Sequence, residues 1–332
     1  MKPLQTVLPA VTVLMSVFNG EKWLEISIKS ILNQTFEDFE FIIVDDGSTD
    51  NSLAIIKHFQ TLDSRIVVIA KINTGLADSL NHGIRLARGV WIARIDADDI
   101  SEPTRLEKQL ALANCSSNIV FVGAGLMIID ANGRTIETYS YPTQHEQLLS
   151  NLRTLRKFPA HSSAFYKRQI VSSLNGYRPR IRRSEDHDLW LRMSQFGEFR
   201  ALQEPLIRLR HHQEQISNDE GGMRQLFDGR LATVSYWLRS SGMPDPIDAS
   251  EEDFKVFYEW LHDQCVDDDF FEYCAFLVAV RSEFAREPRT LKNILNLMTK
   301  LLLKPALLIY LIKLRYFGDT SARRIALKWR NR

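Results

Sequence analysis

The sequence has few cysteines, almost no net charge and no apolar leader. Its three cysteines, Cys115, Cys265 and Cys274, form no CxxC pair in 332 residues. This spacing argues against a disulfide framework or a zinc site and favours a reducing compartment. The formal net charge of +1 gives no overall attraction to nucleic acid. Residues 1–10 contain no apolar run long enough for a signal peptide, so we expect a cytoplasmic protein.

Two nucleotide-binding fingerprints are also missing from the first half of the chain. Neither GxGxxG nor GxxxxGK[ST] occurs there. Their absence argues against a dinucleotide-dependent dehydrogenase and against a P-loop enzyme. A nucleotide, if one binds, has to be held by carboxylates, a metal ion and the backbone at the ends of strands.

Apolar runs alternate with segments of helical spacing from residue 11 to residue 95. The predicted strands are residues 11–15, 39–44, 66–70 and 90–95. The helices predicted between them are residues 21–33, 51–60 and 76–87. Strands and helices that alternate with short connections form right-handed βαβ units. The pattern therefore predicts an α/β fold with a mostly parallel sheet and helices on both of its faces.

The middle of the chain is mixed, and its last third is helical. The elements predicted there are a helix at 105–112, strands at 119–129, 135–140 and 161–166, a hairpin turn at 130–134, and helices at 223–240, 253–264 and 270–283. A chain of this length can bury a full core and has room for one large domain and an appendage.

Three carboxylates, those of Asp96, Asp98 and Asp99, follow the strand predicted at 90–95. Ligands bind α/β sheets at the carboxyl ends of parallel strands, and the run 45–50 (Asp-Asp-Gly-Ser-Thr-Asp) should reach the same edge. Clustered carboxylates raise one another's pKa unless a cation lies among them, and Mg²⁺ or Mn²⁺ accepts such oxygen ligands. The cluster therefore predicts a divalent-metal site that carries a diphosphate, with a solvated acidic turn as the alternative.

A second group of acids opens a predicted helix near residue 185. Ser184 is a candidate N-cap, and three acids within residues 185–188 crowd the first turn, where the helix dipole favours anions. One of them, such as Asp186, is a candidate general base, with helix-end electrostatics as the alternative. Further on, Arg210 and His212 could meet a diphosphate or a metal ion, although a pair of histidines on a loop is more often surface decoration.

Taken in order, these motifs resemble glycosyltransferase family 2, a family of inverting nucleotide-sugar glycosyltransferases. The resemblance covers about residues 9–217. Its motifs are residues 13–20, 43–50, 73–77, 96–99, 185–192 and 210–212. Each motif is weak alone, but the ordered set is specific. The resemblance implies a GT-A fold over residues 1–220, that is, a Rossmann-like, mostly parallel sheet flanked by helices, followed by a helical C-terminal region at 221–332.

The resemblance also implies residue roles, with Mn²⁺ or Mg²⁺ as the cofactor. Asp186 matches the catalytic base, and Glu185 touches the acceptor or orients its loop. Asp98, aided by Asp99, binds the metal ion at the diphosphate, while Asp96 holds the ribose or the donor sugar. The acidic motif aligns with that of the family in more than one register, so the division of roles among these three stays open. The residues that match nucleotide-sugar-binding positions are Ser16, Phe18, Asp45, Asp46, Asn73, Asp96, Asp98, Arg210 and His212.

Within the nucleotide pocket, the resemblance implies that Asp46 accepts the uracil N3 proton, with Asp45 beside it. Ser16 and Phe18 would line the base and the ribose. Phe18 departs from the family, which often has Tyr there, so any contact through a ring hydroxyl is lost. The Gln-x-x-Arg-Trp motif of processive members does not occur in the sequence, so we expect transfer of one sugar per acceptor.

The implied function is metal-dependent, inverting transfer of a hexose or N-acetylhexosamine from a nucleotide-sugar. The expected donor is UDP-linked, and the expected acceptor is a glycan or a lipid-linked glycan of cell-surface polysaccharide biosynthesis. One alternative, a sugar-phosphate nucleotidyltransferase, needs a basic Gly-rich loop after the first strand, which residues 18–21 do not supply. A second alternative, a membrane-docked scaffold with a decayed pocket, conflicts with the intact Asp46, Asp98 and Asp186.

Residues 291–314 form a leucine-rich segment that lysines and Pro305 interrupt. Charges this frequent argue against a helix that spans a membrane. A basic amphipathic helix within 291–332 could instead lie on anionic lipid, at the inner face of the cytoplasmic membrane. The alternative is an ordinary core helix followed by a solvated basic tail.

Overall fold

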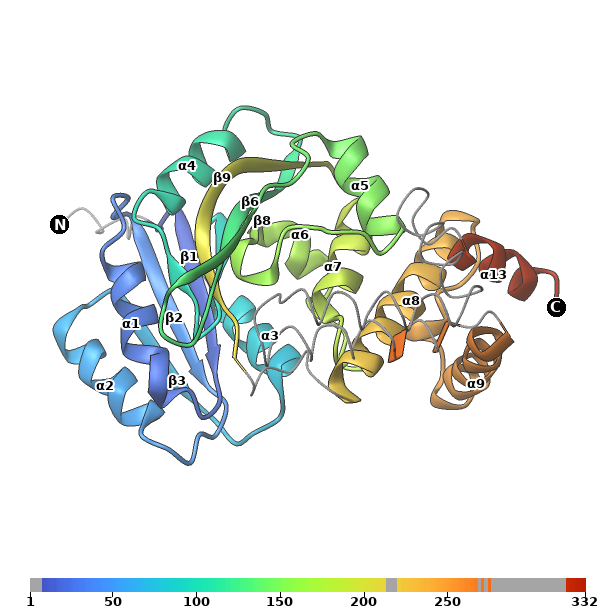
Figure 1. The fold of residues 1–332 in the computed structure, drawn as a ribbon, viewed down its shortest axis with the longest axis horizontal. Helices are drawn as coiled ribbons and strands as arrows, with labels where there is room; N and C mark the ends of the chain where they lie inside the picture. Colours follow the sequence, from blue (N-terminus) through green and yellow to red (C-terminus); the bar gives the residue numbers. More distant parts are fainter. Residues whose placement is uncertain (1–7, 213–219, 268–269, 272–273, 276–320) are drawn as a thin grey trace, which may run out of the picture. The chain divides into compact units, whose positions relative to one another are not determined.

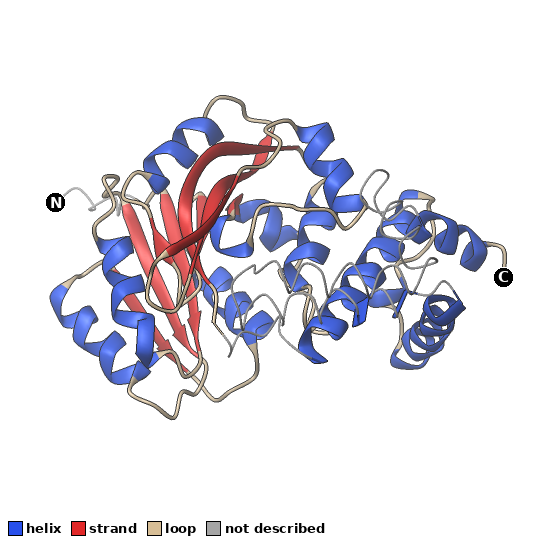
Figure 2. Cartoon of the chain, in the orientation of Figure 1, coloured by secondary structure: helices blue, strands red, loops and turns tan. Residues whose placement is uncertain are grey.

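The computed structural model describes residues 8–212, 220–267, 270–271, 274–275 and 321–332. Helices flank a nine-stranded sheet in this part of the chain (Figures 1 and 2). The chain divides into two compact units, described one by one below. The first unit consists of Met1–Leu149, Phe158–Pro179 and Met193–Arg210, and the second of Ser150–Lys157, Arg180–Arg192 and His211–Arg332. A compact unit is not the same as a folding domain, so the boundary expected at residue 220 stays a prediction.

The first four strands of the first unit are parallel. They are β1 (Val11–Val17), β2 (Phe39–Asp45), β3 (Ile66–Ala70) and β4 (Trp91–Arg94), in the order β3-β2-β1-β4. Nearly every residue of β1, β2 and β4 is buried, as expected for strands that helices cover on both faces. The fold class predicted from the sequence is confirmed.

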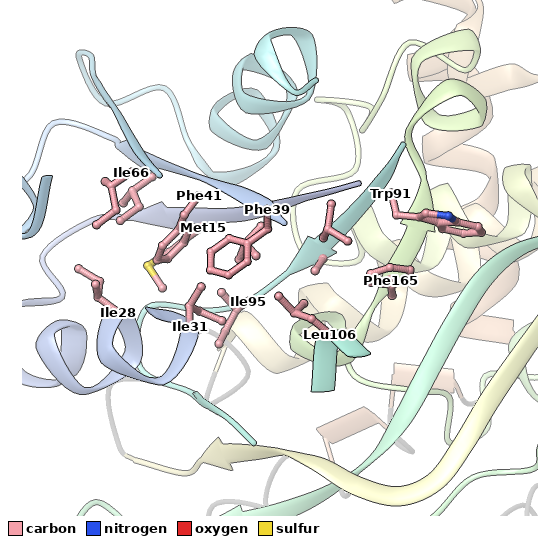
Figure 3. Close-up of a cluster of buried hydrophobic side chains, with 14 of the residues drawn as sticks. Met15, Ile28, Ile31, Phe39, Phe41, Ile66, Trp91, Ile95, Leu106 and Phe165 are labelled. Carbon is pink, nitrogen blue, oxygen red and sulfur yellow. The ribbon is translucent and has the colours of Figure 1, made fainter. Parts of the chain in front are cut away.

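Three helices cover the two faces of these strands. They are α1 (Glu21–Leu32), α2 (Ser52–Leu62) and α3 (Leu76–Leu86). Met15 and Phe41 point to the face covered by α1, where they join Ile28 and Ile31 in one apolar cluster (Figure 3). Because side chains alternate along a strand, Leu14 points to the other face. There it contacts α3 so closely that a Cβ on Gly83 would lie 2.2 Å from its Cδ1.

The other half of the sheet contains both antiparallel and parallel pairs of strands. Its strands are β5 (Ile100–Ser101), β6 (Ile119–Ile129), β7 (Thr135–Tyr139), β8 (Phe165–Lys167) and β9 (Glu198–Arg210). β8 lies between β4 and β6 and is antiparallel to both, whereas β9 is parallel to β6 and antiparallel to β5. β6 and β7 form the predicted hairpin. The helices are α4 (Arg105–Ala113) and α6 (Arg168–Ser173), with α5 (His145–Arg153) running from the first unit into the second.

The strand predicted at 161–166 is wrong in its first half. Residues His161–Ser163 form a 3₁₀ turn, and the strand is Phe165–Lys167. The physical reason is that serine hydroxyls compete for local polar groups. The Ser163 hydroxyl donates to the Ala160 carbonyl (2.8 Å), and the Ser162 hydroxyl bonds a carboxylate described below.

The sequence also failed to predict β9, α5 and α6. β9 carries many charged residues and contains Pro205, which is unusual inside a strand. The register of β6 against β9 shifts on both sides of Gly125, which is paired with Pro205. A Cβ on Gly125 would lie 2.5 Å from the Gln203 carbonyl oxygen. A bulge over a glycine therefore accommodates the proline.

The second unit is helical. Its main helices are α7 (Glu185–Met193), whose last residue belongs to the first unit, α8 (Glu220–Ser240), α9 (Glu251–Asp267) and α13 (Ser321–Arg330). Its apolar core includes Phe257 and Leu261 of α9, together with Ala322, Ile325 and Ala326 of α13. The apolar side of α13 is thus buried, while its basic residues face solvent.

The predicted lipid-binding segment is described only in this last helix. Residues 291–314, and most of the helix expected at 270–283, lie outside the described residues. Within the described ranges, no helix has both the length and the apolarity required to cross a membrane.

Glu40 of β2 is a buried carboxylate that ties three segments together. Its Oε1 accepts hydrogen bonds from the Thr12 hydroxyl (2.7 Å) and from the Arg88 backbone amide (2.6 Å). Its Oε2 accepts from Arg88 Nε (2.7 Å). Burial acts to raise the pKa of Glu40, but these donors outweigh burial and hold the pKa below its ordinary value.

Glu40→Gln is expected to lower the free energy of unfolding by about 1–3 kcal/mol at pH 7. The side-chain nitrogen of glutamine would then face a hydrogen-bond donor of Thr12 or Arg88 and could not accept from it. A carboxylate with a depressed folded-state pKa stabilises fully above its unfolded-state pKa and loses this effect as the pH falls through the folded-state value. The deficit should therefore shrink below about pH 4. Urea unfolding of both proteins at pH 7 and pH 3 measures this loss of stability. An equal loss at the two pH values would contradict its assignment to the ionised carboxylate of Glu40. In the control Glu25→Gln, loss of the exposed pair with Lys29 should leave the free energy of unfolding almost unchanged.

Candidate functional site

The parallel register brings the carboxyl ends of the first four strands to one edge of the sheet. Val17 at the end of β1 pairs with Asp45 of β2, which pairs with Ala70 at the end of β3. Arg94 ends β4 and pairs with Leu14 of β1. Because β1 lies between β2 and β4, the two acidic runs leave the sheet on either side of β1. The sequence predicted this convergence.

The acidic cluster, defined as Asp96, Asp98 and Asp99, lies directly after β4. One carboxylate oxygen from each residue lies within 4.8 Å of the others. Asp99 is buried, whereas Asp96 and Asp98 are partly exposed. Carboxylate oxygens gathered at this spacing are a donor set that fits Mg²⁺ or Mn²⁺. The residues present therefore fit the divalent ion that the sequence predicted, and Asp98 is the more accessible of its two expected ligands.

Asp96 is held in place by groups on its protein side. The Ser162 hydroxyl donates to Asp96 Oδ2 (2.7 Å) and accepts a hydrogen bond from the Asp96 backbone amide (2.9 Å). Arg94 forms an ion pair with the same carboxylate, and its Nη1 also donates to Ser162 Oγ (3.1 Å). On the other side, the Ser27 hydroxyl of α1 donates to the Asp96 carbonyl (3.0 Å). These contacts fix the orientation of Asp96.

The carboxylates of the cluster differ in acidity. Burial acts to raise the pKa of Asp96, but Arg94 outweighs it and lowers that pKa. For Asp99, burial, followed by the charges of Asp98 and Asp96, raises the pKa well above its ordinary value. The nearby His161 is kept neutral because burial and Arg94 lower its pKa well below the usual range.

Asp46, the predicted uracil acceptor, is engaged by the loop after β3. Its Oδ1 accepts from Lys71 Nζ (2.5 Å) and from the Thr74 amide (2.9 Å), and its Oδ2 accepts from the Gly75 amide (2.9 Å). Burial acts to raise the pKa of Asp46, but these donors, Lys71 first, lower it. Because a carboxylate has about four acceptor positions, these bonds leave about one for a ligand.

The remaining predicted base-pocket residues lie at the same edge. Asp45 is buried, and its Oδ1 has no hydrogen-bond partner within the described residues. Phe18 after β1 is 54% exposed, and Ile72 after β3 is 82% exposed. Large apolar side chains this exposed at strand ends suit a flat aromatic ligand. Ser16 is partly buried and Asn73 is exposed.

Arg210, predicted at the diphosphate, is buried beneath the acidic cluster. Its backbone amide donates to Asp99 Oδ1 (2.8 Å), and its Nε donates to the Asp98 carbonyl (2.9 Å). Its Nη1 donates to the carbonyls of Asp130 and Ala131 in the β6–β7 turn (3.2 Å each). The observed contacts of Arg210 thus support the acidic loop, and its contact with a diphosphate stays a prediction.

The predicted catalytic base lies in the second unit. Asp186 is in the first turn of α7 and is partly exposed, whereas Glu185 is 7% exposed. The backbone amide of His187 donates to Asp186 Oδ1 (2.7 Å). Before the helix, the hydroxyl of Ser184 donates to the Gln225 carbonyl of α8 (2.7 Å). The candidate base therefore lies on a helix whose N-terminal end is hydrogen-bonded to α8.

The amides of Arg182 and Arg183 add to this attachment, since both donate to Asp228 of α8 (3.2 Å each). His212, which the sequence placed at the diphosphate, is partly buried and also belongs to the second unit.

Four residues that surround these carboxylates were not predicted from the sequence. They are Lys71, Arg94, Arg105 and Ser162. An arginine inside an otherwise apolar strand, as Arg94 is, was a usable signal, because arginine is rarely fully buried unless it is paired. Ser162 gave no such signal, since its partner Asp96 is 66 positions away in the sequence.

Comparisons with known proteins identify the family. The model of the family described as Glycosyl transferase family 2 matches residues 12–174. The O-antigen biosynthesis glycosyltransferase WbnJ of Escherichia coli is 34% identical over 188 residues, which cover 56% of this chain and 72% of WbnJ. The chain belongs to glycosyltransferase family 2. It is a glycosyltransferase, so the nucleotidyltransferase and scaffold alternatives lose their support.

Solved structures of glycosyltransferases share the fold of this chain. Residues 1–349 of S. aureus TarS, in complex with UDP-GlcNAc, match with a TM-score of 0.59 and 16% identity, over 88% of this chain and 79% of that TarS fragment. The mannosyltransferase PcManGT of Pyrobaculum calidifontis, in complex with GDP-Man and Mn²⁺, matches with a TM-score of 0.53 and 17% identity, over 98% of this chain and 89% of PcManGT. The fold of this family 2 member is therefore of the GT-A type.

Proposed function

We propose that the chain transfers one sugar, with inversion, from a UDP-sugar to a glycan or lipid-linked acceptor, aided by Mn²⁺ or Mg²⁺. The observation that carries this proposal is the acidic cluster at the end of β4, which β1 alone separates from β2 and its Asp45 and Asp46. A donor laid along this edge would place its base near Phe18 and its diphosphate near Asp98 and Asp99. A glycan acceptor is supported by the likeness to WbnJ, an O-antigen biosynthesis glycosyltransferase.

The base and sugar ends of the donor are assigned to different strand ends. Asp45 and the remaining acceptor position of Asp46 would take the N3–H of uracil, while Phe18 and Ile72 flank its ring. Asp96, held by Arg94 and Ser162, would orient ribose or donor hydroxyls. A bound divalent ion would neutralise charge on the departing diphosphate.

In the transfer step, Asp186 accepts the proton of the acceptor hydroxyl. The hydroxyl oxygen forms a bond to the anomeric carbon as the bond from that carbon to the diphosphate oxygen breaks. Attack from the face opposite the leaving group inverts the anomeric configuration. Glu185, which is buried, would orient the loop before α7.

We further propose a cytoplasmic location with peripheral membrane contact. The apolar side of α13 is already buried in the second unit, so it is not available for insertion into lipid. The exposed basic residues of this helix would instead supply electrostatic attraction to anionic lipid.

The first test is calorimetric titration of the folded protein with UDP and GDP, with and without Mn²⁺. The proposal expects micromolar UDP binding in Mn²⁺ that is lost when the ion is chelated, and weaker binding of GDP. GDP binding tighter than UDP binding would assign a guanosine donor instead. Failure of both nucleotides to bind would overturn the nucleotide pocket.

A further inference from the structure

A groove in the second unit lies between α13 and the end of α8, two helices that pack against each other (Figure 1). The groove has a volume of about 210 Å³. Its lining includes Trp237, Ser240 and Ser241 from the end of α8, and Arg323, Leu327 and Arg330 from α13. One water molecule needs only roughly 10–15 Å³ measured in this way, so the groove has room for a phosphate group.

Three arginines gather at this groove. The guanidinium carbon of Arg323 lies 5.1 Å from the centre of the Trp237 ring, and that of Arg153 of α5 lies 5.6 Å from it. Arg330 lines the same groove. In the described part of the chain, none of the three arginines forms an ion pair with a carboxylate. Like charges gathered in one place repel one another, and an anion bound among them would relieve this repulsion.

The hydrogen-bond donors of the groove are mainly those of its arginines. The hydroxyl of Ser240 donates to the Tyr236 carbonyl and that of Ser241 to the Trp237 carbonyl (2.8 Å each). Because these hydroxyl hydrogens are used within the helix, the guanidinium N–H groups are the donors that face a ligand. A guanidinium group matches two oxygens of a phosphate at once. The lining therefore fits a phosphate group.

Apolar surface lies beside these charges. Arg323, Leu327 and Arg330 follow one another at spacings of four and three residues, so they share one side of α13. Leu327, between the two arginines, is 46% exposed, and Trp237 is half-buried. Tryptophan favours the level of lipid headgroups, where its ring meets apolar surface and its N–H meets polar groups. Cations beside exposed apolar atoms thus suit a phosphate that carries acyl chains better than a free phosphate ion.

We propose that the groove between α8 and α13 is a binding site for the phosphate of an anionic phospholipid headgroup. Arg323 and Arg330 donate to the phosphate, and Trp237 lies at the level of the headgroups. The inference rests on the proposed membrane contact and gives that contact a defined site. Attraction by charge alone depends on how many basic residues lie near the lipid. A site depends on which residues they are, so the basic residues of α13 are not equivalent.

The test measures cosedimentation of the whole chain with vesicles of phosphatidylcholine, alone or mixed with an equal amount of phosphatidylglycerol. We expect binding to the mixed vesicles only. Arg323→Gln should lower the partition coefficient at least about tenfold, because it removes hydrogen bonds to phosphate as well as a charge. Lys328→Gln is the matched control on the same helix, since Lys328 does not line the groove and donates to Gln264 of α9 (2.9 Å). It should lower the coefficient by no more than about twofold.

Trp237→Leu keeps every charge and should still lower the partition coefficient about fivefold, because it removes the ring that lies among the headgroups. If Trp237→Leu does not fold, the two glutamine variants decide the matter. Equal losses in Arg323→Gln and Lys328→Gln would overturn the site and leave attraction by charge alone. Failure of the wild type to bind the mixed vesicles would overturn both the site and the proposed membrane contact.

Two titrations of the same proteins complete the test. Glycerol 3-phosphate is the headgroup phosphate without acyl chains, and calorimetry should show no micromolar binding of it. Micromolar binding would assign the groove to a soluble phosphate ester and overturn the lipid. UDP should bind all variants as it binds the wild type, so loss of UDP binding in every protein would count against the proposed donor pocket and not against the groove.

Discussion

Asp186→Asn is expected to lower kcat by about 10²–10⁴-fold while donor binding stays unchanged. Asparagine has nearly the shape of aspartate, and its carbonyl oxygen can still accept the amide hydrogen of His187, so the start of α7 should keep its structure. It cannot, however, accept a proton from an acceptor hydroxyl. The expected result is therefore a protein that binds UDP like the wild type and does not turn over.

The measurement pairs sugar transfer with UDP calorimetry on the same protein sample. Asp263→Asn is the matched control, because Asp263 is a 79% exposed carboxylate on α9 of the second unit. This control should retain wild-type kcat. Transfer by Asp186→Asn within about threefold of the wild type would place the base at another residue.

Asp98→Asn is expected to remove Mn²⁺-dependent binding of UDP. Asp98 is one of the two partly exposed members of the acidic cluster, so a divalent ion can reach its carboxylate from solvent. Loss of groups that merely support metal ligands costs about 10–100-fold in affinity, so loss of a ligand should cost more. UDP affinity in Mn²⁺ should then fall to the value that the wild type shows with a chelator.

Calorimetry with UDP in Mn²⁺ and in chelator makes this comparison. Asp38→Asn, which changes an exposed carboxylate elsewhere in the first unit, should behave as the wild type. If the response to Mn²⁺ survives in Asp98→Asn, then the ion is held by Asp96 and Asp99, and the expected division of roles within the motif is wrong.

The sequence revealed those parts of the fold that depend on local patterns. β1, β2 and β4 are short apolar runs bounded by turns, and their parallel arrangement follows from the helices between them. β9 was missed because its apolar pattern is broken by charges and by Pro205, and the bulge over Gly125 that accommodates this proline is a long-range feature. Local composition does not contain that information.

The same distinction holds for the site. Adjacent carboxylates at the end of an apolar strand were enough to locate the acidic cluster. The sequence could not show that Asp46 is engaged by Lys71, Thr74 and Gly75, since those bonds depend on the path of a loop more than twenty residues later. Nor could it show that Arg210 lies beneath the cluster. Motif position predicts where a residue lies along the chain more reliably than it predicts what the side chain touches.

Arg210 connects the acidic loop to a strand that lies outside the segment recognised by the family. The match ends at residue 174, whereas Arg210 is the last residue of β9, and its amide bonds to Asp99 across 111 positions of sequence. A polypeptide cut at the end of the match would leave the edge of β6 without β9 and the acidic loop without its support. The smallest piece able to assemble the supported acidic cluster is therefore longer than the segment that the family model matches. It becomes complete only when β9 has been synthesised and has paired with β6.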